Sequence, residues 1–241
     1  MVLTLRKQND MKRKDLVFVL FLILLFIPFF IFSSLSSFYL KVNAEHGFLT
    51  AFVKFAVLAT AGELAGLRIR TGNYFIKGFG IIPRAVVWGV LGIFIKIAFM
   101  IFSAGVPPIL GYLGMNDPSA SLSGPLSIQR VLVAFSISLF LNLFFSPVLM
   151  TLHRVTDAHI QLGKGTMNGL FSRINVLNIL ETIDWKMHWG FILKKTIPLF
   201  WIPAHTLTFL LPPDFQILFA ALLGIVLGII LAFAASGNTD K

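Results

Sequence analysis

Six apolar stretches, each close to 20 residues long, constrain the fold of this chain more than any other feature of its sequence. A helix needs about 20 apolar residues to cross the hydrocarbon core of a bilayer. Only 12% of the 241 residues are charged, whereas soluble domains carry about 25%. The sequence therefore predicts an all-α integral membrane protein, a bundle of about six transmembrane helices over residues 16–40, 47–66, 85–104, 131–152, 190–211 and 215–235.

The basic residues predict an orientation for these spans. Lysines and arginines gather before the first span, between residues 68 and 84, and again between residues 154 and 195. Residues 105–129 contain none. Because cytoplasmic loops carry an excess of Lys and Arg, both termini are expected on the cytoplasmic or matrix side. A bacterial cytoplasmic membrane is the favoured location, with an organelle membrane as the alternative. The net charge of +10 has the same origin, so no nucleic acid partner is expected.

The chain divides into three parts by composition. Residues 1–46 form a basic N-terminus and an additional anchor helix, residues 47–235 the membrane domain, and residues 236–241 a short polar tail. The beginning resembles a signal peptide with cleavage after Ala44, but its apolar run is longer than the usual 7–15 residues. An uncleaved helix is therefore expected.

Three segments have a predicted structural role. Residues 105–125 are rich in Pro, Gly and Ser and are expected to form an outer loop. Gly224 and Gly228 have the spacing that lets a second helix approach closely. In the inner segment, apolar residues recur at helical spacing and predict an amphipathic interfacial helix, with two tryptophans at headgroup depth; these residues are Leu170, Ile174, Leu177 and Leu180, followed by Trp185 and Trp189.

No motif of catalytic chemistry is found. The chain has no cysteine, which excludes disulfides and thiolate sites. The stretch "QLGKGT" lacks the first glycine and the Ser or Thr of a phosphate loop. His153, Asp157 and His159 lie close in sequence, but a metal site there lacks a third histidine in register. Neither an enzyme, nor a cofactor, nor a metal site is predicted.

Polar residues inside the predicted spans are the candidate functional groups. Such residues are costly in lipid and usually face the bundle interior or water. At 1.5 Å per residue, four of them lie at depths of roughly 15–22 Å from the inner side: Lys54, Lys96, Asn142 and His205. If they face one another, they form a net-positive constriction that favours anions.

A purely structural interpretation is open at the same residues. Lys54 can extend its amine to the outer interface. Lys96 can pair with Glu63, which lies nearer the inner side. Asn142 can bridge two helices by hydrogen bonds. Water access to Lys96 would distinguish the two interpretations.

Residues 193–216 contain Trp201, Pro203, His205, Thr208, Phe209 and Pro213. This pattern resembles the signature of the Mpv-seventeen/peroxisomal-membrane-protein-twenty-two family. Further matches are Gly62 with Glu63, Pro83 with Trp88, and Asn142 with Pro147. Val86, by contrast, stands where the family has a histidine. The resemblance covers residues 47–235 and implies a small multi-span protein linked to channel-like permeation of small solutes and to metabolite homeostasis.

The sequence thus predicts a channel or facilitator for a small solute or anion. Pro198 and Pro203 are expected to bend the fifth span toward the bundle interior. The predicted pore-lining residues are Lys54, Glu63, Lys96, Asn142, His205 and Thr208. The alternative is a non-transporting scaffold or subunit that binds a partner through its basic inner face. The expected partners are the lipid bilayer, the solute and, in an oligomer, further copies of the chain.

Overall fold

All regular elements of the described chain are helices. The computed structural model describes the backbone of residues 2–236 and the side chains of residues 13–230, and no strand occurs in that part. The predicted polar tail lies outside the described residues except for Ser236. The chain forms two compact units, Met1–Gly47 and Phe48–Lys241.

The first unit contains two helices where the sequence predicted one span over residues 16–40. Helix α1 (Val2–Ile31) ends before Phe32, whose backbone is extended with φ −106° and ψ 103°, and α2 (Ser33–Glu45) follows. The Ser36 hydroxyl bonds to the Phe29 carbonyl across this joint. The apolar segment long enough to cross a membrane is therefore shorter than predicted, Arg13–Ile31.

Five helical segments of the described chain are long and apolar enough to cross a membrane. Besides the first, they are α3 (Gly47–Thr71), α4 (Ile81–Tyr112), the continuous run Ile128–Leu162, and α12 (Pro213–Ser236) up to Ile230. The continuous run consists of α6 (Ile128–Phe140), η1 (Leu141–Phe145) and α7 (Ser146–Leu162).

The predicted span over residues 190–211 is not among these five. It consists of a π-helix, η2 (His188–Trp201), and the α-helix α11 (Ile202–Leu210). Pro198 lies inside η2 and Pro203 in the first turn of α11, so the two prolines flank the change from π- to α-helical hydrogen bonding.

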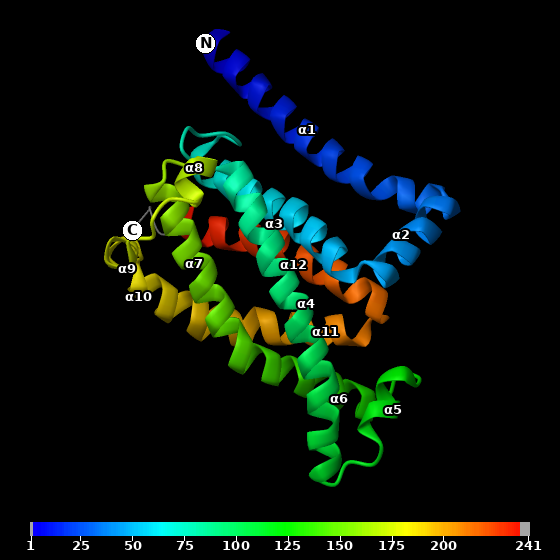
Figure 1. Cartoon of the computed structure of the whole chain (residues 1–241). Coiled ribbons are helices and arrows are strands. Elements are labelled where there is room, and N and C mark those ends of the chain that lie inside the picture. The colour runs from blue at the N-terminus through cyan, green and yellow to red at the C-terminus, as the bar shows by residue number, and fades with distance from the viewer. Residues whose placement is uncertain (1, 237–241) are drawn as a thin grey trace. The chain divides into compact units, whose positions relative to one another are not determined.

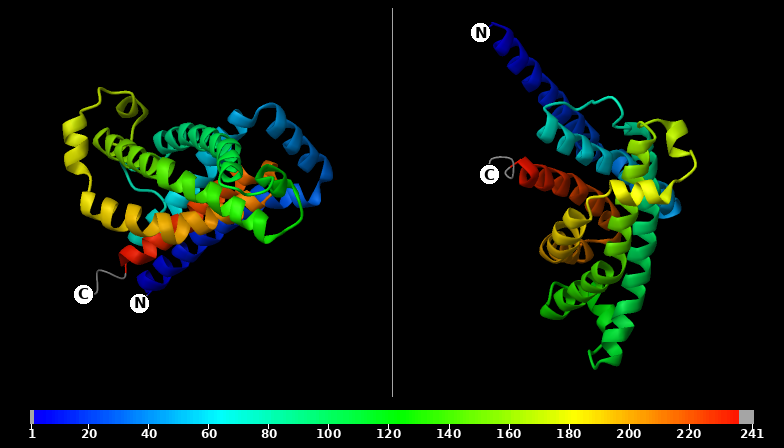
Figure 2. Two further views of the ribbon diagram at one scale, coloured as in Figure 1. Left: turned by 90° about the horizontal axis from the view of Figure 1, so that it is seen from below. Right: turned by 90° about the vertical axis from the view of Figure 1, so that its left-hand side faces the viewer.

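The outer loop predicted over residues 105–125 is largely helical. Helix α4 continues through Pro107 and Pro108 to Tyr112, and Val106 and Pro107 are buried. Helix α5 (Pro118–Ser123) follows, and Asp117 caps it by accepting from the Ala120 N–H at 3.4 Å. It packs at the ends of α4 and α6 (Figures 1 and 2).

The prediction of a single amphipathic helix in the segment between α7 and η2 is also wrong. Three short helices replace it: α8 (Met167–Leu170), α9 (Val176–Thr182) and α10 (Trp185–Met187). Asn175 and Asp184 accept hydrogen bonds from the backbone N–H groups of Asn178 and Met187, at 3.2 and 2.9 Å. Such side-chain caps compete with a continuous helix.

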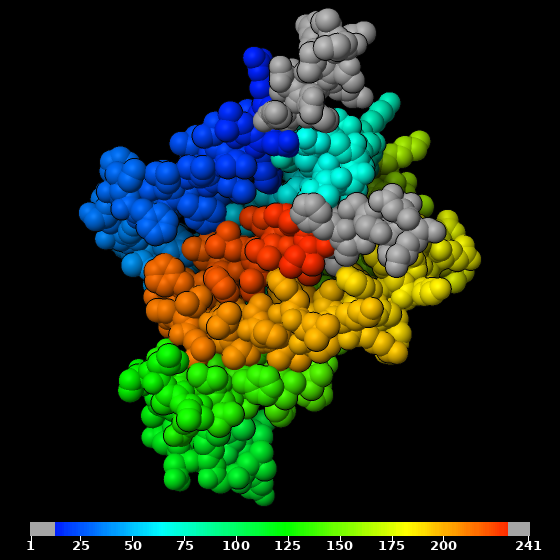
Figure 3. Space-filling view, turned by 180° about the vertical axis from the view of Figure 1, so that it is seen from behind, coloured from blue at the N-terminus to red at the C-terminus, as the bar shows by residue number. Residues whose placement is uncertain are grey.

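The predicted close approach at the last helix is confirmed. A Cβ atom on Gly228 would lie 2.7 Å from the Gly62 carbonyl oxygen, and one on Gly62 would lie 2.8 Å from the Gly224 carbonyl oxygen. Helices α3 and α12 therefore touch through their backbones. Helix α12 also packs against η2 through Ile197, Trp201, Leu223 and Leu227. Figure 3 shows η2, yellow to light orange, beside α12, orange to red.

Candidate functional site

A cavity of about 660 Å³ lies inside the second unit. Helices α3, α4, α7, η2 and α12 contribute most of its walls. Its mouth is formed by Arg70, Lys77 and Gln161, which are exposed, and by the half-buried Arg154. Its deep end is formed by Phe99, Trp201 and His205, which are buried. The cavity therefore runs from the basic ends of the helices toward their middle.

The deep end is closed by aromatic and polar packing. The Phe99 ring lies 5.5 Å from the His205 ring and 4.8 Å from the Phe209 ring, centroid to centroid. Asn142 holds His205 from the other side, with 3.0 Å between Nδ2 and Nδ1. Among the described residues, none between 100 and 140 lines the cavity.

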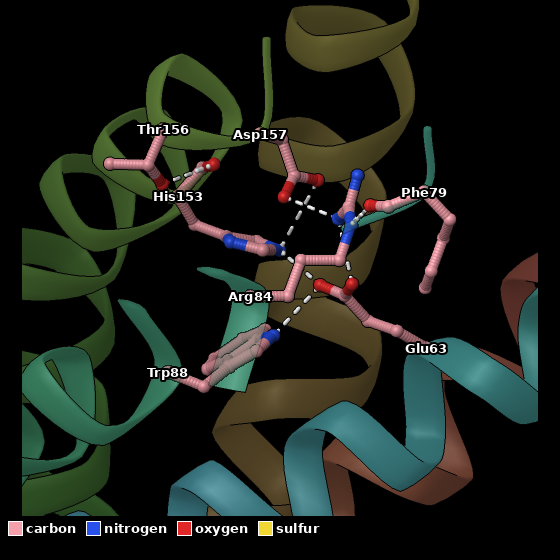
Figure 4. A network of polar contacts seen from close by, with 7 residues as sticks. All are labelled: Glu63, Phe79, Arg84, Trp88, His153, Thr156 and Asp157. Atoms are coloured by element: carbon pink, nitrogen blue, oxygen red, sulfur yellow. Dashed lines mark hydrogen bonds and ion pairs between the residues drawn. The ribbon is translucent and has the colours of Figure 1, made fainter. Parts of the chain in front are cut away.

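A buried guanidinium organises the charged residues of the cavity (Figure 4). Arg84 Nη1 lies 2.7 Å from Glu63 Oε2 and 2.5 Å from Asp157 Oδ1, and Arg84 Nε donates to the Phe79 carbonyl at 2.8 Å. The Phe79 ring covers the guanidinium at 4.4 Å. Arg84 is only 4% exposed, so the network ties α3, α4 and α7 together on the mouth side of the cavity.

Glycines place Arg84 at this point. Gly80, with φ 76°, precedes α4, and its position leaves no room for a Cβ because one would lie 2.8 Å from Gly165 Cα. Gly165 also has a left-handed backbone, with φ 66°. The loop before α4 thus packs directly on the turn after α7, which explains Gly165 of "QLGKGT" without any phosphate site. Only glycine adopts such backbones freely.

Trp88 and His153 complete the network. Trp88 Nε1 donates to Glu63 Oε1 at 2.7 Å. His153 Nε2 lies 3.4 Å from Glu63 Oε1 and 3.8 Å from Asp157 Oδ2, and its ring lies 4.2 Å from the Trp88 ring. Arg84 with Trp88, and His153 with Asp157, are pairs four residues apart, which share a helix face.

The same cluster satisfies the distance test for a metal site. The ligand atoms of Glu63, His153 and Asp157 all lie within 4.8 Å of one another. The sequence analysis missed the third ligand because it comes from another helix. Arg84 Nη1, however, already bonds to both carboxylates, and a second cation beside it would be repelled. The arrangement favours an ion-pair network over a metal centre.

The predicted pore-lining residues are only partly brought together. Glu63 and His205 line the cavity, and Asn142 bonds to His205 from outside it. Asn142 also donates to the Ser138 carbonyl at 2.8 Å, so it joins two helices, as the structural interpretation expected. Thr208 is fully buried and donates to the Ala204 carbonyl of its own helix at 2.9 Å.

Neither membrane lysine lines the cavity. Lys54 is 8% exposed on α3, and Lys96 Nζ lies 5.9 Å from the centre of the Phe48 ring. The ion-pair partner of Glu63 is Arg84 instead of Lys96. Four cavity residues were absent from the predicted pore lining: Arg84, Trp88, His153 and Asp157. The sequence suggested His153 and Asp157 only as a metal site, and Trp88 only through the family resemblance. A signal for Arg84 was present, since a buried acid in α3 requires a cation and Arg84 is the first basic residue of the next helix.

His188 lies at the side of the cavity near its mouth. Its Nε2 is 3.0 Å from Thr151 Oγ1.

Comparisons of the chain with protein-family models, with curated proteins and with solved structures gave no match. The family resemblance described above thus stays a prediction, and the proposed function is based on the geometry of the cavity.

Proposed function

We propose that this chain is a multi-pass membrane protein that acts as a channel or facilitator for a small anionic solute, with the cavity as its binding chamber. The supporting observation is the cavity itself, which joins an exposed basic mouth to a buried end. Its volume of about 660 Å³ falls in the range of about 300–1,000 Å³ typical of small-molecule sites. Both termini lie on the cytoplasmic side in this proposal, and a bacterial cytoplasmic membrane is the favoured location.

The charges of the lining favour an anion. Two carboxylates, Glu63 and Asp157, face four cationic side chains, which are Arg70, Lys77, Arg84 and Arg154. The lining therefore has an excess of positive charge with all histidines neutral. A concave site of one sign concentrates ligands of the opposite sign, and rings of Arg and Lys select anions in pores.

A sixth crossing is part of the proposal. The 14 residues of η2 and the 9 residues of α11 suffice for a core of about 30 Å at roughly 1.5 Å per residue. The side chains of η2 that pack on α12 are apolar. With this segment included, an even number of crossings leaves both termini on the basic side.

Cysteine accessibility tests the chamber directly, because the chain has no cysteine of its own. Ser146 lines the cavity and Ser138 does not, yet both are at least 97% buried and both exchange for cysteine with little change in volume. We expect Ser146→Cys to react with a small, membrane-impermeant anionic thiosulfonate added on the cytoplasmic side. Ser138→Cys should stay unreactive.

The outcome decides between the proposed functions. Reaction of Ser146→Cys that slows in the presence of a small carboxylate supports a solute chamber. Equal protection of both cysteines, in folded protein, would favour the scaffold reading. One observation favours the scaffold function. Phe171 and Leu177, which lie in sequence on either side of Arg173, are 77% and 73% exposed.

A further inference from the structure

We infer that the solute is an aliphatic monocarboxylate, whose carboxylate binds at the basic mouth of the cavity while its hydrocarbon chain extends into the interior. The inference rests on the proposed function and adds to it a substrate class and a limit to the length of the chain. It is supported by the unpaired cations of the mouth, by the apolar walls behind them and by the depth of the cavity.

The cations at the mouth have no partner among the described residues. Arg70, Lys77 and Arg154 line the cavity, and none of them forms an ion pair or a side-chain hydrogen bond with the described part of the chain. Arg84, in contrast, is already bonded to two carboxylates. Guanidinium and ammonium groups bind carboxylates through charge-assisted hydrogen bonds. The carboxylate of the solute is therefore expected at the mouth.

The ion-pair network behind the mouth favours a head group with a single negative charge. Glu63 and Asp157 share one guanidinium, that of Arg84. Because like charges repel, a dianion next to these two carboxylates is disfavoured more strongly than a monoanion. A monocarboxylate therefore fits this part of the cavity better than a phosphate monoester or a dicarboxylate.

Beyond the network the walls of the cavity are mostly apolar. Ile95, Phe145 and Leu149 contribute large side chains. Where α3 meets α12 the lining consists of small residues, which leave room between the helices; these are Ala59, Gly62, Ala220 and Gly224. A hydrated inorganic ion gains little from such walls, whereas a hydrocarbon chain gains about fourfold in affinity for each CH₂ group that it buries. The interior therefore suits a hydrocarbon chain.

The depth of the cavity sets the length of that chain. The Arg70 side chain turns back along α3, and its Nη1 lies 3.7 Å from the position of a Cβ on Gly66. From Gly66 the lining of α3 continues eleven residues deeper, to Phe55, which is roughly 16 Å at 1.5 Å per residue. An extended chain advances roughly 1.2 Å per covalent bond. A carboxylate bound to Arg70 therefore leaves room for about 12–14 carbons.

Binding of labelled straight-chain carboxylates to the purified protein in detergent tests the inference. The series runs from butanoate to hexadecanoate, each at a known free concentration, and binding to protein-free micelles is subtracted. We expect the affinity to rise about fourfold for each added CH₂ group and to stop rising at about 12–14 carbons. Dodecanol should bind about tenfold more weakly than dodecanoate, because it lacks the charge that the mouth binds.

Ala59→Leu tests whether the hydrocarbon chain lies in the cavity. Ala59 lines the cavity four residues before its lining on α3 ends at Phe55, so a larger side chain there shortens the interior by roughly 6 Å. The rise in affinity should stop about five carbons earlier, while butanoate binds as to the wild type. Ala56→Leu is the matched control, because Ala56 lies on the same helix, is half-buried and does not line the cavity. It should keep the wild-type limit.

Arg70→Gln/Lys77→Gln tests the binding of the carboxylate. Loss of both cations should weaken the binding of every member of the series by about the same factor, roughly tenfold, without changing the length at which the affinity stops rising. Arg173→Gln/Lys186→Gln removes the same charge at two exposed residues that do not line the cavity. This control should bind the whole series like the wild type.

The outcomes separate the two proposals. Carboxylates that bind with an affinity independent of chain length overturn the inference and leave the anion chamber standing. A rise that continues through hexadecanoate, equally in the wild type and in Ala59→Leu, shows that the chains bind outside the cavity and also overturns it. The absence of binding for every carboxylate, together with an unreactive Ser146→Cys, overturns the proposed function itself. The series with the wild type requires no variant, so it decides the question even where a substitution prevents folding.

Discussion

At the scale of single residues, Arg84 is the side chain on which the described site depends most. It bonds to two carboxylates and a carbonyl while being almost fully buried. Removing one member of a buried ion pair leaves an uncompensated charge, at a cost of about 3–5 kcal/mol. Arg84→Gln leaves two such carboxylates and should therefore lower the unfolding temperature in detergent by many degrees.

Arg84→Lys should recover little of this loss, because an ammonium group cannot reproduce the planar fork of a guanidinium. Replacing both carboxylates as well, in Arg84→Gln/Glu63→Gln/Asp157→Asn, should recover a large part of it. Arg173→Gln, at an exposed position, is the control and should leave the unfolding temperature unchanged. If Arg84→Gln were as stable as Arg173→Gln, the network would contribute nothing to the stability of the fold.

Individual residues of the site differ in how well they could be predicted from the sequence. Glu63 and His205 could be chosen from sequence because a polar group in an apolar stretch is visible without knowing its neighbours. Arg84 is harder to choose, because it follows a basic loop and is counted there with the charges that predict the orientation of the spans. His153 and Asp157 need Glu63 from a distant helix to form a cluster, and no spacing along one segment reveals such a partner.

At the scale of helices, the contact between α3 and α12 predicts different effects on stability for alanine substitutions at its two glycines. A Cβ on Gly62 would lie 2.8 Å from the Gly224 carbonyl oxygen, whereas one on Gly224 would meet nothing closer than Ala59 at 3.8 Å. Gly62→Ala therefore forces two backbones apart, which costs about 1–3 kcal/mol. Gly224→Ala should be neutral or slightly stabilising, because alanine favours the helix.

Thermal unfolding of the two variants in detergent measures this difference. The two glycines face each other across one contact, so each variant serves as the control for the other. Equal unfolding temperatures would mean that the helices are not in backbone contact at this point.

Helix boundaries were harder to predict than the existence of helices. Apolar runs of about 20 residues predicted α3, α4, the continuous run Ile128–Leu162 and α12, because a helix of that length and composition is what a bilayer accommodates. The break at Phe32 and the three short helices after α7 depend on local hydrogen bonds, such as the caps made by Asn175 and Asp184. These bonds favour the end of a helix over its continuation by small free energies. The hydropathy of the sequence does not detect them.

At the scale of the whole second unit, the cavity opens at its mouth and is closed at its deep end by Phe99, which packs on His205 and Phe209. Passage of a solute requires this closure to open. Under the proposed function, Phe99→Ala should remove this closure, so that a small carboxylate such as lactate crosses proteoliposomes faster than with the wild type. Phe94→Ala is the control, because Phe94 lies on the same helix, is 42% exposed and does not line the cavity.

A rate for Phe99→Ala no higher than that for Phe94→Ala, in protein that remains folded, would place the closing element elsewhere. The unfolding temperature of Phe99→Ala should fall in either case, since truncation of a buried phenylalanine typically costs about 3–5 kcal/mol. Flux and stability therefore have to be measured on the same preparation.

The sequence distances within the ion-pair network imply an order of events during biosynthesis. Glu63 and Arg84 are 21 residues apart and belong to consecutive helices, whereas Asp157 follows Arg84 by 73 residues. Chains emerge from the ribosome N-terminus first, so the α3–α4 hairpin can enter the membrane with its acid already neutralised. Asp157 arrives later to a cation that is already in place. The glycine contact with α12 forms after both, and it closes the wall of the chamber only once α12 has been synthesised.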